Sequence, residues 1–291
     1  MRKHPLAEVF GFPCDNLSPQ AQRCRRLKLC PFNNKVPNCT KDKANDPLGV
    51  CSIHEDSAPV ITCPIRFRED WRIAEDAAKF FFQEGTNWTS LTEVRLADAE
   101  GKSAGNIDLV LVSYDSRGKI TDFGAVEVQA VYISGNVRRP FEAYMGNPET
   151  MFDMDWTTES NYPRPDYLSS SRKRLAPQLI YKGGILKTWN RKTAVILNSG
   201  FFATLPKLQV VKPEDADIAW LVYELHRDDA FGTYRLRLNK TVYTKFRNAL
   251  DQITRSAAGD EEMFMRLLQS KLDEKLEDGN QPDTHTIEEE L

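Results

Sequence analysis

The chain has 291 residues, of which 41% are hydrophobic and 28% are charged. That balance is typical of a folded globular protein and excludes a largely disordered chain. The longest apolar runs, such as Leu109–Val112, are far shorter than the roughly 20 residues of a membrane helix, and no secretory signal pattern opens the chain. We therefore expect a cytoplasmic protein with no membrane partner.

The formal net charge is −3, and it is unevenly distributed. Residues 259–291 contain eleven acidic and three basic side chains, while the other 258 residues contain 31 acidic and 36 basic ones. The body is therefore mildly basic and the acidity belongs to the C-terminal segment, which we interpret as a solvated helix and tail. A nucleic-acid partner is compatible with this distribution.

Residues 1–68 are rich in proline and contain every cysteine of the chain: Cys14, Cys24, Cys30, Cys39, Cys51 and Cys63. Little periodic apolar pattern is present, so we predict a loop-rich module ordered by a metal, because metal binding can supply folding free energy. Four thiolates suit Zn²⁺ or iron. Since no close Cys-x-x-Cys pair occurs, spacing does not select the ligands, and unrelated thiols are the alternative. His54 is either a substitute ligand or a solvated loop residue.

A regular pattern begins after residue 68. Apolar residues at helical spacing predict a helix over 70–83. Strands are predicted over 91–97, 107–114 and 120–133, with a glycine-containing turn at 115–118 between the last two.

The second half is predicted to alternate between helices and strands. Residues 146–170 are turn-prone, and a helix over 174–189 is expected to be interrupted at Gly183-Gly184. Strands are predicted over 193–197, 201–204, 218–225 and 234–238, and helices over 241–255 and 261–277. We divide the chain into a metal module (1–68), a core (69–258) and an acidic helix with its tail (259–291).

Three polar residues on neighbouring predicted strands form the first candidate site. Glu127 and Gln129 are two residues apart on one strand and so share a face, and Asp108 lies on the strand before. Two carboxylates at that place suit Mg²⁺, which prefers oxygen ligands and activates water. The alternative is an ordinary polar hairpin face. The apolar surroundings of Glu127 favour the metal site, because an unpaired carboxylate there is costly.

A basic segment, Arg164–Lys192, has eight basic side chains against one acidic one. Tyrosine and tryptophan residues are interleaved among them. This composition favours contact with DNA phosphates, and the alternative is a solvated surface. The candidate DNA-binding residues are Arg172, Lys173, Arg174, Lys187, Arg191 and Lys192.

The order of short motifs resembles that of the NotI-type restriction endonucleases. The motifs are Phe10-Gly11, Cys30-Pro31-Phe32, Cys39, Gly49-Val50-Cys51, Cys63-Pro64, Gly124–Gln129, Gly135, Asn198–Phe202 and Ala219–Leu225. The resemblance covers about residues 5 to 250. It implies a PD-(D/E)XK restriction-endonuclease-like fold of the α/β class: a mixed sheet flanked by helices, with a small N-terminal cysteine-metal module.

The resemblance also implies roles for individual residues. Asp108 and Glu127 would bind Mg²⁺, and Gln129, which replaces the usual lysine, would orient the attacking water. A structural metal site, with iron expected, maps to Cys30, Cys39, Cys51 and Cys63, and the thiolates by themselves suit Fe or Zn. Cys14 and Cys24 have no counterpart. Glu75 is either a further active-site acid or an exposed partner of Lys79 at helical spacing.

The expected function is that of a type II restriction endonuclease, which cleaves double-stranded DNA at a specific sequence with Mg²⁺. Cutting both strands of a palindrome needs two sites, so a homodimer is expected, and a cognate methyltransferase would share the target sequence without binding the enzyme. The alternatives are a non-catalytic, metal-stabilised DNA-binding protein and a PD-(D/E)XK nuclease of DNA repair.

Overall fold

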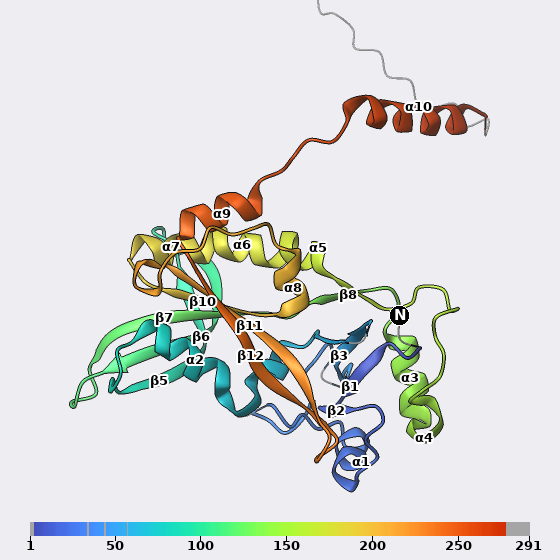
Figure 1. The fold of residues 1–291 in the computed structure, drawn as a ribbon, viewed down its shortest axis with the longest axis horizontal. Coiled ribbons are helices and arrows are strands. Elements are labelled where there is room, and N and C mark those ends of the chain that lie inside the picture. Colours follow the sequence, from blue (N-terminus) through green and yellow to red (C-terminus); the bar gives the residue numbers. More distant parts are fainter. Residues whose placement is uncertain (1–2, 34, 44, 57, 278–291) are drawn as a thin grey trace, which may run out of the picture. The chain divides into compact units, whose positions relative to one another are not determined.

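The computed structural model describes residues 3–33, 35–43, 45–56 and 58–277. It contains two compact units, Met1–Ile253 and Thr254–Leu291. The strands are β1 (Leu6–Val9), β2 (Phe12–Pro13), β3 (Val50–Glu55), β4 (Ala58–Ile61), β5 (Trp88–Ala97), β6 (Ser103–Tyr114), β7 (Ile120–Gln129), β8 (Tyr132–Ser134), β9 (Arg164–Asp166), β10 (Thr193–Asn198), β11 (Ile218–Asp228) and β12 (Thr233–Thr244) (Figure 1).

The α-helices are α1 (Pro19–Arg26), α2 (Arg72–Phe81), α3 (Arg138–Gly146), α4 (Pro148–Met151), α5 (Tyr167–Ser170), α6 (Ala176–Gln178), α7 (Gly184–Thr188), α8 (Ser199–Thr204), α9 (Phe246–Thr254) and α10 (Glu261–Glu277). Two π-helical segments, η2 (Ser171–Leu175) and η3 (Leu179–Gly183), and two 3₁₀ segments, η1 (Pro64–Trp71) and η4 (Pro213–Asp215), complete the elements. Among the described residues, none of these helices is both long and apolar enough to cross a membrane.

A six-stranded mixed sheet with the order β12-β11-β10-β7-β6-β5 forms the centre of the first unit. β10 runs parallel to both β7 and β11, whereas the other neighbours are antiparallel. All six residues of β10 are buried, as expected of a strand with both faces covered. The expectation of a mixed sheet flanked by helices is confirmed.

Helices cover the two faces of this sheet (Figure 1). Alternate residues of β6 and β7, including Leu109 and Val126, share a core with the buried face of α2. The residues between them, including Val110 and Ala125, share another core with Leu186 of α7. Because side chains alternate along a strand, Asp108 and Glu127 belong to the face on which α7 packs.

The N-terminal residues form more regular structure than predicted. A four-stranded sheet with the order β2-β1-β3-β4 replaces the expected loops, and α1 follows β2. All four residues of β1 are buried, so these short strands show no alternation of polar and apolar residues from which they could be recognised. The division of the body at residue 68 stays a prediction.

One continuous helical run extends from α5 to α7, over residues 167–188. The predicted interruption at Gly183-Gly184 is wrong, because both glycines have helical dihedral angles (φ −62°, ψ −36° and φ −61°, ψ −45°). An added Cβ on Gly183 would lie 2.7 Å from a ring carbon of Phe246. Gly183 therefore allows close packing against Phe246, and neither glycine breaks the helix.

Two further predictions are corrected. Residues 201–204 belong to helix α8, whose first turn is capped by the Asn198 side chain, and the apolar run there packs in a core as a helix. The helix predicted from residue 241 begins at Phe246, because β12 continues to Thr244 in its ladder with β11. The strands predicted over 91–97, 107–114, 193–197 and 218–225 are confirmed.

The second unit contains α10, which has the bounds predicted from the sequence. Residues 261–276 of this helix are exposed. The last part of the predicted acidic tail, 278–291, lies outside the described residues.

Candidate active site

Asp108 on β6 and Glu127 on β7 are brought together by the pairing of the two strands. The β6–β7 ladder ends at the Leu109–Val126 pair, and Asp108 and Glu127 are the next residues of the two strands beyond that pair. An Oδ2 atom of Asp108 accepts a hydrogen bond from the backbone N–H of Val128 at 2.8 Å. The sequence prediction that these carboxylates converge is thus realised in the geometry, whereas their chemical roles remain predictions.

Glu127 and Gln129 are almost fully enclosed, with 4% and 1% of their surface exposed. Burial, and next the neighbouring Asp108 carboxylate, raise the pKa of Glu127 to about 7, while Lys182 acts against this rise. Within the part of the chain that the structure describes, the Oε1 atoms of Glu127 and Gln129 have no hydrogen-bond partner. Free buried oxygens beside a second carboxylate fit a hard divalent cation.

The donor set is small. Over the described ranges, no group of three or more His, Cys, Asp or Glu side chains is arranged to hold a metal. Mg²⁺ commonly binds through one or two carboxylates and completes its coordination with water and substrate phosphate. Asp108 and Glu127 therefore fit Mg²⁺ as a partial site that needs the substrate.

The helical run brings two further polar side chains to the pair. Gln178 accepts a hydrogen bond from the side-chain amide of Gln129, and Nζ of Lys182 donates to Oε2 of Glu127 at 2.5 Å. Sequence reasoning placed Lys182 in a basic surface segment and missed both residues. Their spacing of four residues along a predicted helix is the signal that puts them on one face.

Glu75 does not join this group. It is exposed on α2, and α2 packs on the other face of the sheet. The ion pair of Lys79 is made to Asp76, at 2.7 Å, and not to Glu75 as one alternative proposed.

The cysteines Cys30, Cys39, Cys51 and Cys63 lie near one another in the N-terminal region. The backbone N–H of Cys63 donates to the carbonyl of Cys51 at 3.2 Å, and an isolated bridge joins Leu29 and Asn38, the neighbours of Cys30 and Cys39. Burial, with smaller contributions from the thiols of Cys63 and Cys39, raises the pKa of Cys30 to about 11. Burial also raises the pKa values of Cys39 and Cys51, and Cys63 adds to the rise in both.

These mutual effects place the four thiols close together, although they do not form a closed metal cluster in the described structure. The pKa values of the remaining two cysteines, Cys14 and Cys24, show no such effect from another thiol. Cys14 donates to the carbonyl of Leu6 at 3.5 Å, and Cys14 and Cys24 are both buried in the apolar core of the N-terminal region. Cys14 and Cys24 are therefore small core residues of that region.

The six candidate DNA-binding residues fall into two groups. Arg172 and Lys173 are exposed on the helical run. The other four have partners within the chain: Arg174 lies over the Tyr132 ring, Lys187 pairs with Asp217, Arg191 pairs with Asp122, and Lys192 donates to the carbonyl of Phe80. Basic residues in one segment of sequence therefore differ in their availability to a phosphate.

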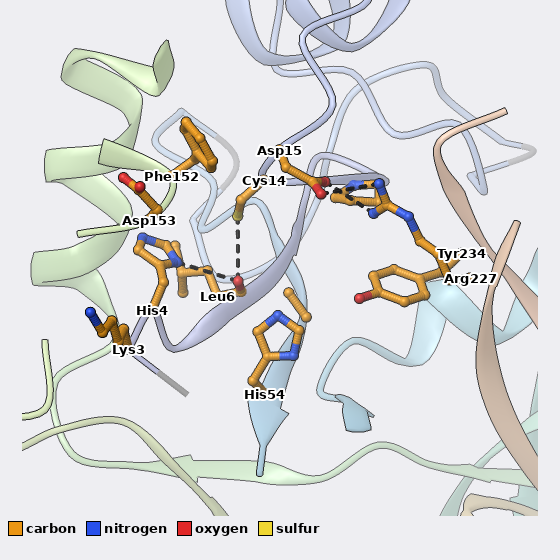
Figure 2. A pocket seen from close by; sticks show the side chains of 12 residues that line it. Lys3, His4, Leu6, Cys14, Asp15, His54, Phe152, Asp153, Arg227 and Tyr234 are labelled. Atoms are coloured by element: carbon orange, nitrogen blue, oxygen red, sulfur yellow. Dashed lines mark hydrogen bonds and ion pairs between the residues drawn. The ribbon is translucent and has the colours of Figure 1, made fainter. Parts of the chain in front are cut away.

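A cavity of about 270 Å³ lies apart from the carboxylate pair, in the N-terminal region (Figure 2). His4 and Cys14 both reach the carbonyl of Leu6 there, and Asp15 is paired with Arg227 at 3.0 Å. The Asp15–Arg227 ion pair at this cavity joins the N-terminal region to the β11–β12 hairpin.

The comparison with protein families agrees with this geometry. Residues 15–236 match the family model described as restriction endonuclease NotI. The chain belongs to the NotI restriction endonuclease family. That membership suggests a DNA nuclease. A search of curated proteins gives no match.

Proposed function

We propose that this protein is a type II restriction endonuclease that cleaves double-stranded DNA at a specific sequence and requires Mg²⁺. The observation that carries the proposal is the pair formed by the half-buried Asp108 and the buried Glu127 within a chain of the NotI family. The two carboxylates would hold Mg²⁺, which supplies charge stabilisation at the scissile phosphate and a more acidic water. Gln129 is neutral at all ordinary pH values, so its part is to orient a water.

The proposal includes a homodimer. Each chain has one Asp108–Glu127 pair, and cutting both strands of a symmetric site calls for two such pairs related by a twofold axis. We propose that Arg172 and Lys173 contact the phosphate backbone, because they are the exposed members of the basic set. A cognate methyltransferase would protect the same sequence.

The proposal also includes a structural metal held by Cys30, Cys39, Cys51 and Cys63. The two backbone pairings described above, and the mutual effects of the thiols on their pKa values, support this set. Four thiolates suit iron and zinc alike. The site would be structural, because four protein ligands leave no position for a substrate.

The deciding experiment is digestion of a long DNA of varied sequence with Mg²⁺, followed by sequencing of the fragment ends. A restriction enzyme gives discrete fragments whose ends share one sequence, and Glu127→Ala gives none. A repair nuclease would give ends that follow damage or branching. Retention of DNA without cleavage under Mg²⁺ or Mn²⁺ would instead support the non-catalytic DNA-binding protein.

A further inference from the structure

Lys182 forms a buried ion pair with Glu127, one of the two proposed Mg²⁺ ligands. Nζ lies 2.5 Å from Oε2 of Glu127, and the two side chains are only 6% and 5% exposed. The same Nζ donates to the backbone carbonyl of Asn106, two residues before Asp108, at 2.8 Å. One ammonium group therefore connects the helical run to both strands that carry the carboxylates.

The positive charge of Lys182 partly balances the two carboxylates of Asp108 and Glu127. Among the described residues, Lys182 is the basic side chain that forms an ion pair with the carboxylate pair. It engages Oε2 of Glu127, so that Oε1, which has no protein partner in the described structure, stays available. A buried carboxylate without compensation is costly and tends to move or take up a proton. Lys182 offsets that cost, while the buried Oε1 keeps no protein partner among the described residues and can bind a cation.

The helix that carries Lys182 is itself fixed. Lys182 lies within the π-helical segment η3, and such wide turns often occur at functional sites. One helical turn earlier, Gln178 accepts from Gln129. At the next position after Lys182, Gly183 lies against Phe246 of α9. The ammonium is thus placed by packing on both sides of the helix.

We propose that Lys182 is a positioning residue for DNA cleavage, which fixes the Glu127 carboxylate and the β6 backbone in the arrangement that receives the divalent cation. The inference rests on the proposed function. It also predicts that a lysine introduced at position 129 can replace the ammonium group of Lys182. Residue 129 is two residues from Glu127 on the same strand and therefore shares a face with it.

A buried ion pair that only holds the fold together is the competing explanation, and burial by itself does not separate the two. The test compares wild type, Lys182→Met, Lys182→Arg and the double variant Lys182→Met/Gln129→Lys. Single-turnover cleavage with saturating Mg²⁺ gives the rate, and DNA binding with Ca²⁺ in place of Mg²⁺ gives a readout apart from cleavage. Lys79→Met is the matched control, since that lysine forms an exposed ion pair on α2.

We expect Lys182→Met to cleave about 100-fold more slowly, as small misplacements at a reacting centre do, with DNA affinity within about threefold of wild type. The double variant should recover at least about tenfold of that rate, because it returns an ammonium to the same face. Lys182→Arg should fall between wild type and Lys182→Met, and Lys79→Met should match wild type.

Cleavage by Lys182→Met at the wild-type rate overturns the inference. So does a folded single variant that loses DNA binding together with cleavage, or a slow single variant that Gln129→Lys does not rescue. If Lys182→Met does not fold, Lys182→Gln takes its place in both single and double variants. If the wild-type protein cuts no DNA with Mg²⁺, the proposed function and this inference are both overturned. If the wild type cuts, the rates of the variants test the role of Lys182 separately from the proposed function.

Discussion

The carboxylate of Asp108 accepts a hydrogen bond from the backbone N–H of Val128 across the β6–β7 pair, at 2.8 Å. One oxygen of Asp108 therefore hydrogen-bonds the β7 backbone, while the carboxylate charge lies beside Glu127. Substitutions can separate the contribution of the hydrogen bond from that of the charge.

Asp108→Asn keeps an oxygen that can accept from Val128 but removes the negative charge. We expect its free energy of unfolding to stay near that of wild type, with cleavage slowed by about 100-fold or more because the metal loses a ligand charge. Asp108→Ala leaves the Val128 N–H without a partner and should cost about 1–3 kcal/mol in addition. Urea unfolding and Mg²⁺-dependent cleavage measure the two effects, and equal stability of the two variants would contradict this division.

Arg66 stabilises the junction between the N-terminal sheet and the core. It is fully buried, with a nitrogen 3.0 Å from Glu8 and another 2.6 Å from Glu69. Arg66→Met removes the ion pair of the buried Glu8 carboxylate and leaves the buried Glu69 carboxylate with the 3.4 Å ion pair to Arg235. The variant should lower the free energy of unfolding by about 3–5 kcal/mol.

The control for this variant is Arg72→Met. Its partner Asp70 is 3.7 Å away and both side chains are about half exposed. Exposed pairs contribute about 0–1 kcal/mol, so little change is expected. Chemical denaturation of both variants at one pH measures the two changes in unfolding free energy. Similar decreases in both would show that the buried ion pairs of Arg66 contribute no more stability than the exposed pair of Arg72.

The stability of the fold should depend on pH through His4. Burial lowers the pKa of His4 from its usual 6.5, although the Leu6 carbonyl and Asp153 oppose the change. Because the folded protein then binds fewer protons than the unfolded chain, the contribution is present above pH 6.5 and is lost as the pH falls below it toward the lowered pKa. His4→Gln should flatten that part of the profile of unfolding free energy against pH.

His226→Gln is the comparison for His4, because the His226 side chain is 47% exposed. Thermal or urea unfolding between pH 5 and pH 8, roughly the range in which histidines titrate, gives both profiles. If the unfolding free energy of His4→Gln still falls at acid pH as it does in the wild type, other titrating groups cause the loss of stability.

The four-cysteine site predicts a metal content that depends on particular thiols. Iron or zinc should be near stoichiometric in the purified protein and should be lost in Cys51→Ser, with a lowered melting temperature. Cys24→Ala should keep the metal, since Cys24 is a core residue of α1, and should cost only about 1 kcal/mol of packing. Elemental analysis decides between these outcomes, and metal retained in Cys51→Ser argues against this ligand set.

The exposed basic residues should govern the salt dependence of DNA binding. Replacing both Arg172 and Lys173 by alanine should weaken binding to all sequences and lower the slope of log K against log salt by roughly 2. Lys102→Ala serves as the control, because Lys102 pairs with Glu100 in the turn between β5 and β6. Fluorescence anisotropy over a range of salt concentrations measures the slope, and an unchanged slope would place the phosphate contacts elsewhere.

The sequence by itself determined the strands and the pairing that matter most for the site. The apolar runs of β6, β7, β10 and β11 and the turn at 115–118 define a sheet whose alternation places Asp108 and Glu127 on one face. The motif order also pointed to the family that residues 15–236 match. These signals are local or periodic, so that they can be read from one chain.

Only the tertiary structure decided which side chains surround that pair. Lys182 belongs to a basic stretch of sequence, yet it is buried against Glu127 because the helical run covers that face of the sheet. Short buried strands in residues 1–68 likewise have no alternating pattern, and their order depends on hydrogen bonds to partners distant in the chain. Charge and composition are properties of a segment, whereas burial and pairing arise only when segments far apart in the chain pack together.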